Sequence, residues 1–168
     1  TVAAAANAGT IVLDVRSALA FGTAHVPGSV NIGLNGQFAP WAGTLVPANT
    51  PVVLVTDSQE EASEAALRLA RVGLDGIEGF LEGGIAAWEQ AGLALESLEL
   101  VTVTQLHEQL TADPSLQIVD VRRPSEFALG HLPGAVNLPL DRLPDDVVPL
   151  DPERPTAVVC AGGYRSSA

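Results

Sequence analysis

A segment that the chain repeats constrains its fold more than any other feature. Residues 11–32 read IVLDVRSALAFGTAHVPGSVNI, and residues 118–138 read IVDVRRPSEFALGHLPGAVNL. A repeat period this long is far beyond that of a solenoid. We therefore expect two copies of one small domain in these 168 residues, at 1–97 and 98–168. The residues that recur at a constant spacing of 106 positions are Asp14 and Asp120, Arg16 and Arg122, Phe21 and Phe127, His25 and His131, Pro27 and Pro133, Gly28 and Gly134, and Asn31 and Asn137.

Charge and apolar content exclude two classes of partner. The chain has a formal net charge of −12, and its eight basic residues form no stripe of the kind that binds nucleic acid. It has no run of about 18 apolar residues, so we expect no membrane span. The single cysteine excludes an internal disulfide and a multi-cysteine metal site. We expect no metal and no cofactor, and a reducing, cytoplasmic compartment.

Strands and helices alternate along both copies. This alternation predicts an α/β fold with mostly parallel sheets flanked by helices. The predicted strands are Ile11–Val15, Pro51–Thr56 and Ile77–Phe80 in the first copy, and Ile118–Val121 and Thr156–Cys160 in the second. The predicted helices are Glu60–Val72, ended by Gly73, a helix from Gly84 through Trp88 to about Ala91, and Gln105–Leu110, capped by Thr104.

The copies differ where their second strands end. Cys160 stands where the first copy has Thr56, and it is followed by A-G-G-Y-R-S. Paired glycines allow a tight curl there, and Ser166 can open a helix. Successive N–H groups of such a loop form an anion nest, in which a thiolate has a lowered pKa and is nucleophilic. The alternative is an inert cysteine at the end of a core strand.

In combination these motifs resemble the rhodanese family of sulfurtransferases. The resemblance rests on D-V-R, H-x-P-G-A/S-x-N, the cysteine loop and G-G-x-x-x-W, and it covers nearly the whole chain. It implies two rhodanese-like domains. Together with Gln37–Pro47, the tandem also resembles the C-terminal part of proteins that carry a metallo-β-lactamase-fold domain ahead of two rhodanese domains. That narrower resemblance implies such a domain upstream in a longer chain.

The chemistry implied by the resemblance is a persulfide relay in a sulfide-metabolising protein. Cys160 would take sulfane sulfur from thiosulfate, a persulfide or a polysulfide and pass it to a small thiol or to cyanide. Arg165 would either orient an anionic donor or brace the loop through backbone carbonyls, and Tyr164 would lie at the rim. The loop residues whose N–H groups would stabilise the thiolate and the persulfide are Ala161, Gly162, Gly163, Tyr164 and Arg165.

The repeated polar residues are expected to serve the fold. Asp120, Arg122 and His131 all recur in the copy that lacks a cysteine, so their role cannot require catalysis. A polar pair at the strand end and a histidine that braces a turn are the simplest interpretations. In the first copy Thr56 replaces the cysteine and Glu61 replaces Arg165, so we expect that copy to be catalytically silent.

Two rival functions remain open from the sequence. A cysteine phosphatase places five residues between its cysteine and arginine, whereas four lie between Cys160 and Arg165, a spacing that suits a sulfur atom better. A non-catalytic interaction module that supports an upstream domain is the second rival.

The second copy is expected to be incomplete at its C-terminal side. Ala168 corresponds to Glu64, near the start of the first copy's long helix. We therefore expect residues 160–168 to be poorly ordered or distorted, and the neighbouring sheet to expose an apolar flank.

Overall fold

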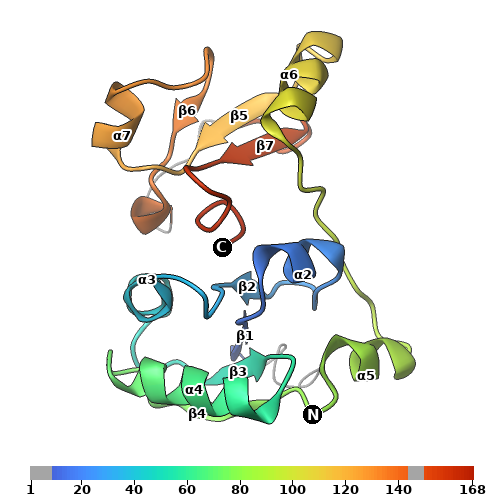
Figure 1. Cartoon of the computed structure of the whole chain (residues 1–168), viewed down its shortest axis with the longest axis vertical. Coiled ribbons are helices and arrows are strands. Elements are labelled where there is room, and N and C mark those ends of the chain that lie inside the picture. The colour runs from blue at the N-terminus through green and yellow to red at the C-terminus, as the bar shows by residue number, and fades with distance from the viewer. Residues whose placement is uncertain (1–8, 144–149) are drawn as a thin grey trace. The chain divides into compact units, whose positions relative to one another are not determined.

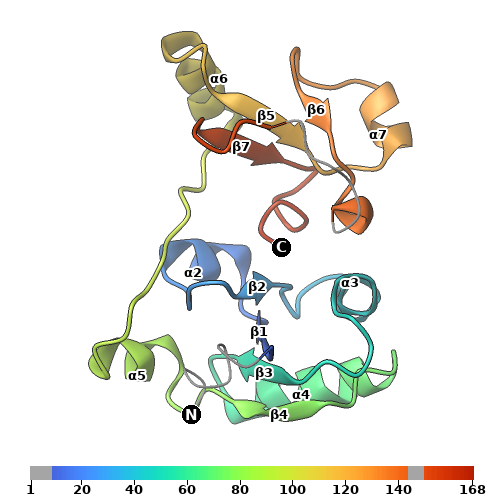
Figure 2. The same cartoon turned by 180° about the vertical axis from the view of Figure 1, so that it is seen from behind.

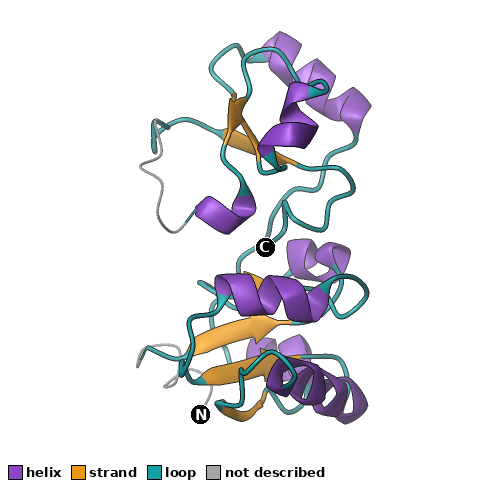
Figure 3. Cartoon of the chain, turned by 90° about the vertical axis from the view of Figure 1, so that its left-hand side faces the viewer, coloured by secondary structure: helices purple, strands orange, loops and turns teal. Residues whose placement is uncertain are grey.

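The computed structural model describes residues 9–143 and 150–168 (Figure 1). The chain divides into two units, one that runs to Glu99 and a second that comprises Leu100–Ser166. The predicted boundary between residues 97 and 98 lies close to this division. Each unit is an α/β structure with a parallel sheet, as the sequence predicts, and in Figure 3 its strands are flanked by helices.

The first unit is built on a four-stranded parallel sheet in the order β2-β1-β3-β4. β1 and β3 are buried almost throughout, because helices cover both faces of a parallel sheet and such strands read as continuous apolar runs. Three of the four strands lie within a residue of their predicted bounds, and β2 was not predicted. The strands are β1 (Ile11–Asp14), β2 (Val30–Asn31), β3 (Val52–Val55) and β4 (Ile77–Phe80).

Among the described helices of the first unit, the sequence predicts two and misses two. α4 (Gln59–Ala70) and α5 (Gly84–Gln90) correspond to predicted helices. α2 (Ala18–Thr23) and α3 (Phe38–Leu45) lie in segments whose turn residues hid the short helices. α3 and α4 pack together (Figure 1, Figure 2).

The predicted ends of α4 are close to those in the structure. Ser58 caps the helix by accepting from the Glu61 N–H at 3.2 Å. Gly73 follows the helix with a φ of +80°, which glycine adopts without steric cost. There the Leu74 N–H reaches back to the Leu69 carbonyl at 3.0 Å, so Gly73 ends the helix as expected.

Trp88 on α5 belongs to the core of the first unit. It is 7% exposed and packs against Val12, Val26 and Val55. Its indole N–H donates to the Ala94 carbonyl at 2.8 Å, so its polar atom is also satisfied. Trp41 on α3 is only half-buried.

The second unit has a three-stranded parallel sheet in the order β6-β5-β7. One face of β7 is open: Val158 is 45% exposed, whereas Leu54, at the corresponding position of the first unit, is 1% exposed. The predicted apolar flank is therefore present. The elements of this unit are β5 (Gln117–Asp120), β6 (Val136–Asn137), β7 (Thr156–Val159), α6 (Val103–Ala112), α7 (Pro124–Ala128) and a 3-10 turn at Leu140–Arg142.

The cap of α6 differs from the prediction. Thr102, not Thr104, is the N-cap, and α6 is longer at both ends than the predicted Gln105–Leu110. The Thr102 hydroxyl accepts from the Gln105 N–H at 3.3 Å, and the Gln105 side chain accepts from the Thr102 N–H at 2.8 Å. This reciprocal capping box satisfies two N–H groups at once, whereas a cap at Thr104 satisfies one.

Across residues 9–143 and 150–168, no helix combines the length and the apolar character needed to cross a bilayer.

Candidate active site

A polar network fixes the carboxyl end of β5 in the second unit. The Arg122 Nε atom donates to both Asp120 carboxylate oxygens at 2.9 Å, and its Nη2 atom donates to the Gly130 carbonyl at 2.8 Å. The Asn137 amide donates to the Asp120 and Arg122 carbonyls and ties β6 to the same point. These bonds hold the strand end and the following loop together. The first unit repeats the network with Asp14, Arg16, Ala24 and Asn31.

The two repeated histidines also share one geometry. His131 Nδ1 lies 2.9 Å from the Phe127 carbonyl oxygen, and its ring stacks on that of Phe127 at 3.7 Å between centroids. His25 and Phe21 form the same pair at 2.9 Å and 3.9 Å. In the part of the chain that the structure describes, no group of three or more His, Cys, Asp or Glu side chains is placed to hold a metal ion. Both histidines therefore have the geometry of a turn brace.

Cys160 directly follows β7, at the carboxyl edge of the parallel sheet where open α/β folds bind their ligands. The chain then curls around the sulfur in the Cys160 loop, residues 160–166. The Gly163 N–H donates to Cys160 Sγ at 3.1 Å, and Ser166 Oγ lies 3.4 Å from the same sulfur. Gly163 has a φ of +80°, the left-handed conformation that its position in the curl requires.

This closed loop contradicts the expectation that residues 160–168 are distorted. Within the loop, the Gly163 N–H and Ser166 Oγ both contact the sulfur and close the curl around it. No helix begins at Ser166 in the described residues, which form bends from Ala161 to Ser166. The helix that Ser166 could open is therefore absent from the described residues, and the Gly163 N–H of the loop contacts the sulfur.

The environment of Cys160 favours the thiolate. Partial burial on its own raises the pKa of the thiol, because it disfavours the charged form. Hydrogen bonds from the Ser166 hydroxyl and from backbone N–H groups of the loop outweigh that effect. The net result is a pKa below that of an ordinary thiol, so a larger share of Cys160 is nucleophilic at neutral pH.

Arg165 is held by a carboxylate that the sequence analysis missed. Its two terminal nitrogens each donate to a Glu126 oxygen at 2.7 Å. The ion pair ties the guanidinium to α7, a contact that neither expectation for Arg165 included. Arg165 lowers the pKa of the Glu126 carboxyl to about 2, so the carboxylate stays charged at neutral pH.

A signal for this pair was present in the sequence. At the 106-residue spacing of the repeat, Glu126 corresponds to Ala20. At the 104-residue spacing that aligns Cys160 with Thr56, Arg165 corresponds to Glu61. The first copy therefore lacks both partners together. Comparison of the two copies for paired losses, rather than for shared residues, would have found Glu126.

The remaining predicted loop residues lie around the sulfur at the surface of the second unit. Ala161, Gly162 and Gly163 are exposed, and Tyr164 is half-buried. A side chain added at Gly162 or Gly163 would meet no heavy atom within 4 Å, so the loop is open on that side. A small donor or acceptor can therefore approach the loop.

The corresponding loop of the first unit, the Thr56 loop (residues 56–61), is internally satisfied. The Thr56 hydroxyl accepts from the Ser58 N–H at 3.0 Å and donates to the Ser58 carbonyl at 2.5 Å. The Glu61 carboxylate accepts from the Asp57 N–H at 3.1 Å. A protein carboxylate thus occupies an N–H group that an anion would need.

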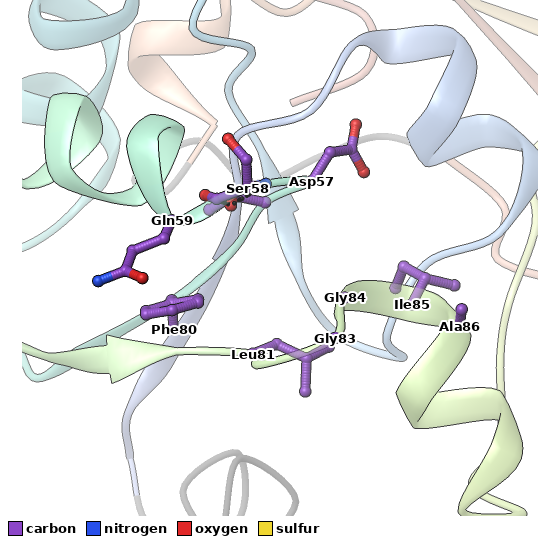
Figure 4. Close-up of a pocket in the computed structure, with 10 residues that line it drawn as sticks. Asp57, Ser58, Gln59, Phe80, Leu81, Gly83, Gly84, Ile85 and Ala86 are labelled. Carbon is purple, nitrogen blue, oxygen red and sulfur yellow. Dashed lines mark hydrogen bonds between the residues drawn. The ribbon is translucent and has the colours of Figure 1, made fainter.

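A pocket of about 370 Å³ opens beside the Thr56 loop, at the carboxyl ends of β3 and β4 (Figure 4). In this view Gln59 lies next to Phe80, and Ile85 and Ala86 line the opposite side. The pocket contains no thiol. Its lining residues are Thr56, Asp57, Ser58, Gln59, Phe80, Leu81, Gly83, Gly84, Ile85 and Ala86.

Comparison with known families agrees with the two-domain fold. The rhodanese-like domain family model matches residues 1–91 and 102–168. The chain belongs to the rhodanese-like domain family. Both units are thus rhodanese-like, and only the second carries a cysteine.

Relatives of known name include sulfurtransferases. The chain is 39% identical over 72 residues to the thiosulfate sulfurtransferase GlpE of Shewanella oneidensis, over 43% of this chain and 70% of GlpE. It is 32% identical over 66 residues to YtwF of Bacillus subtilis, over 39% of this chain and 64% of YtwF. The chain therefore spans about two thirds of the length of these relatives.

A solved structure supports the rhodanese fold. The rhodanese-like domain of the Alr3790 protein from Anabaena superposes with a TM-score of 0.51 at 21% identity. The match covers 56% of this chain and 98% of that domain. At this identity the likeness concerns the fold alone.

Proposed function

We propose that this rhodanese-like protein is a sulfurtransferase that carries sulfane sulfur as a persulfide on Cys160. The observation that supports this most directly is the loop geometry. A cysteine with a lowered pKa lies inside a curl whose Gly163 N–H contacts the sulfur, on a fold of the rhodanese-like family. Its donor is thiosulfate, a persulfide or a polysulfide, and its acceptor is a small thiol or cyanide. We also propose a cytoplasmic location, where the thiol stays reduced.

The reaction divides into two balanced displacements. In the first, the Cys160 thiolate attacks the outer sulfur of the donor, a sulfur–sulfur bond forms at Cys160, and the donor's own sulfur–sulfur bond breaks. The electron pair of that bond leaves with the rest of the donor, as sulfite from thiosulfate or as a thiolate from a persulfide. In the second, an acceptor thiolate or cyanide attacks the outer sulfur of Cys160, and the Cys160 thiolate leaves.

The loop donors stabilise both forms of the cysteine. The Gly163 N–H already donates to the sulfur before the sulfane donor arrives, and the Ser166 hydroxyl, 3.4 Å from the sulfur, donates to it once Cys160 is a thiolate. Preorganised donors of this kind cost no reorganisation when charge develops at the sulfur. The roles of Asp120, Arg122 and His131 in this proposal are structural, since the same bonds occur in the unit without a cysteine.

Mass spectrometry of the intact chain tests the proposal. After incubation with a sulfane donor, the protein should gain the mass of one sulfur atom on Cys160, and the gain should disappear when thiol or cyanide is added. Cys160→Ser should reduce turnover to the background rate, a loss of at least about a hundredfold for removal of a nucleophile. A persulfide that still forms in Cys160→Ser would overturn the assignment.

A non-catalytic interaction module is the second candidate. It is favoured by the first unit, whose loop has no thiol and holds its own Glu61 carboxylate. In this alternative the tandem supports a metallo-β-lactamase-fold hydrolase or dioxygenase domain upstream in a longer chain. The named relatives support the rhodanese-like domains and do not bear on that upstream domain. Wild-type protein that forms no Cys160 persulfide with any sulfane donor would favour this candidate.

A further inference from the structure

The arginines around the Cys160 loop are already paired with carboxylates. Arg165 gives both terminal nitrogens to Glu126, and its side chain is 16% exposed against 34% for Glu126. Arg122 is paired with Asp120 in the same manner at the end of β5. Each pair is neutral as a whole. The Arg165 guanidinium, which the sequence suggested as a partner for an anionic donor, is therefore already bound to a carboxylate of the protein.

What remains for an incoming donor is a set of neutral N–H groups beside a thiolate. The Gly163 N–H donates to the sulfur atom itself, and Ser166 Oγ lies 3.4 Å from that sulfur. Residues 100–168 hold nine acidic residues against five arginines, so the unit adds no long-range attraction for anions. A dianion such as thiosulfate would approach a negative sulfur whose neighbouring guanidiniums, Arg122 and Arg165, are each paired with a carboxylate.

We propose that Glu126 is a specificity-determining residue: by neutralising Arg165 it selects organic persulfides, whose reacting persulfide group carries at most one negative charge, over dianionic thiosulfate. This inference rests on the proposed sulfurtransferase function. For a neutral persulfide R–S–SH, the Cys160 thiolate attacks the terminal sulfur, a new sulfur–sulfur bond forms at Cys160, and the sulfur–sulfur bond of the donor breaks. The electron pair leaves as the thiolate R–S⁻, and the proton remains on the Cys160 persulfide. No step of this reaction needs a free cation.

The comparison of the two copies supports a role at the site rather than in the fold. The bonds made by Asp120, Arg122 and Asn137 recur in the first unit and belong to the scaffold. The Glu126–Arg165 pair has no counterpart there, because Ala20 and Glu61 stand at these positions. The pair is therefore found where the thiol is found.

Glu126→Gln isolates the charge of this residue. Glutamine keeps an acceptor for the Arg123 N–H, which Glu126 Oε2 accepts at 3.1 Å, and one acceptor for Arg165. Glu108→Gln on α6, an exposed position, removes one negative charge from the same unit and serves as the matched control. The full chain is assayed with thiosulfate and with glutathione persulfide, and kcat/KM is compared between the two donors.

We expect the wild type and Glu108→Gln to prefer glutathione persulfide. Glu126→Gln should raise the ratio of the thiosulfate kcat/KM to the persulfide kcat/KM by about tenfold. A tenfold change corresponds to about 1.4 kcal/mol in the free energy of the transition state. The thiosulfate rate of Glu126→Gln should then fall with added salt, because a freed Arg165 attracts the dianion through a screened interaction. The persulfide rate should change little.

Three results would overturn the inference while leaving the proposed function intact. The first is an unchanged ratio in Glu126→Gln. The second is a loss of activity with both donors, which would make Glu126 a positioning residue. The third is a wild type that already uses thiosulfate as well as persulfide through the exposed Arg123, which loss of thiosulfate turnover in Arg123→Gln would show. Absence of any Cys160 persulfide in the wild type would instead contradict the proposed function.

Discussion

At the scale of single residues, the chemistry of this chain depends on which groups contact one sulfur atom. Cys160 is half-buried, and burial alone would make it a poor thiolate. The Ser166 hydroxyl and the backbone N–H groups reverse that effect. The other hydrogen bonds that lower this pKa come from the backbone. The Ser166 hydroxyl is the side-chain contribution, and a substitution can remove it without changing the backbone.

The first prediction concerns that hydroxyl. Hydrogen bonds to a thiolate lower its pKa, so Ser166→Ala should raise the pKa of Cys160. The pH profile of Cys160 alkylation should then move to higher pH, and the rate at neutral pH should fall a few-fold while the plateau at alkaline pH is kept. Ser125→Ala, at an exposed position on α7, is the control and should leave the profile unchanged. A profile that stays in place in Ser166→Ala would show that the backbone N–H groups alone set the pKa.

At the scale of elements, local sequence signals predict the long elements well and the short ones poorly. β1 and β3 are predicted closely because buried parallel strands are nearly continuous apolar runs. α2, α7 and the two-residue strands β2 and β6 are too short to show a period, and tertiary bonds define them.

The cap of α6 gives a prediction at this scale. Thr102→Ala removes the side chain that accepts from the Gln105 N–H, and it should lower the free energy of opening α6 by about 1 kcal/mol. Thr104→Ala is the matched control, because Thr104 lies inside the helix, where alanine has the higher helix propensity, and it should stabilise α6 slightly.

Amide hydrogen exchange of α6 in the full chain measures both variants and avoids the assumption that two units unfold together. Equal effects of the two substitutions would mean that the capping box contributes nothing.

At the scale of the whole molecule, one scaffold occurs twice with different loops on it. The bonds of Asp14, Arg16 and Asn31 match those of Asp120, Arg122 and Asn137, so the strand ends are equally well built in both units. The loops differ in what fills them. The Cys160 loop directs donors at a sulfur, whereas the Thr56 loop bonds to its own Glu61 carboxylate.

This difference predicts that a thiol alone will not activate the first unit. Thr56→Cys on a Cys160→Ser background should stay near the background rate, because Glu61 occupies the Asp57 N–H and repels a thiolate. Adding Glu61→Gln should lower the pKa of the new thiol relative to the double variant, and pH-dependent alkylation measures this change. Robust persulfide formation in Thr56→Cys with Glu61 intact would show that the acidic loop tolerates a sulfur anion.

The sequence by itself determined the features that depend on pattern and on residue chemistry. The repeat at a fixed spacing predicted two α/β units, and the apolar runs predicted their central strands, because strands buried on both faces leave a continuous signal. The glycines and the unique cysteine placed the candidate site, and Gly163 takes the left-handed conformation that a tight curl needs.

Only the tertiary structure decided which partners these residues have. Glu126 and Arg165 are 39 positions apart and meet because the α7 segment and the Cys160 loop lie at the same edge of the sheet. The choice of Thr102 over Thr104 followed from a reciprocal bond with Gln105, and the closed Cys160 loop followed from donors that fold back onto the sulfur. These outcomes depend on distances across the fold. A sequence pattern does not show which partner a charged or polar side chain will contact once the chain has folded.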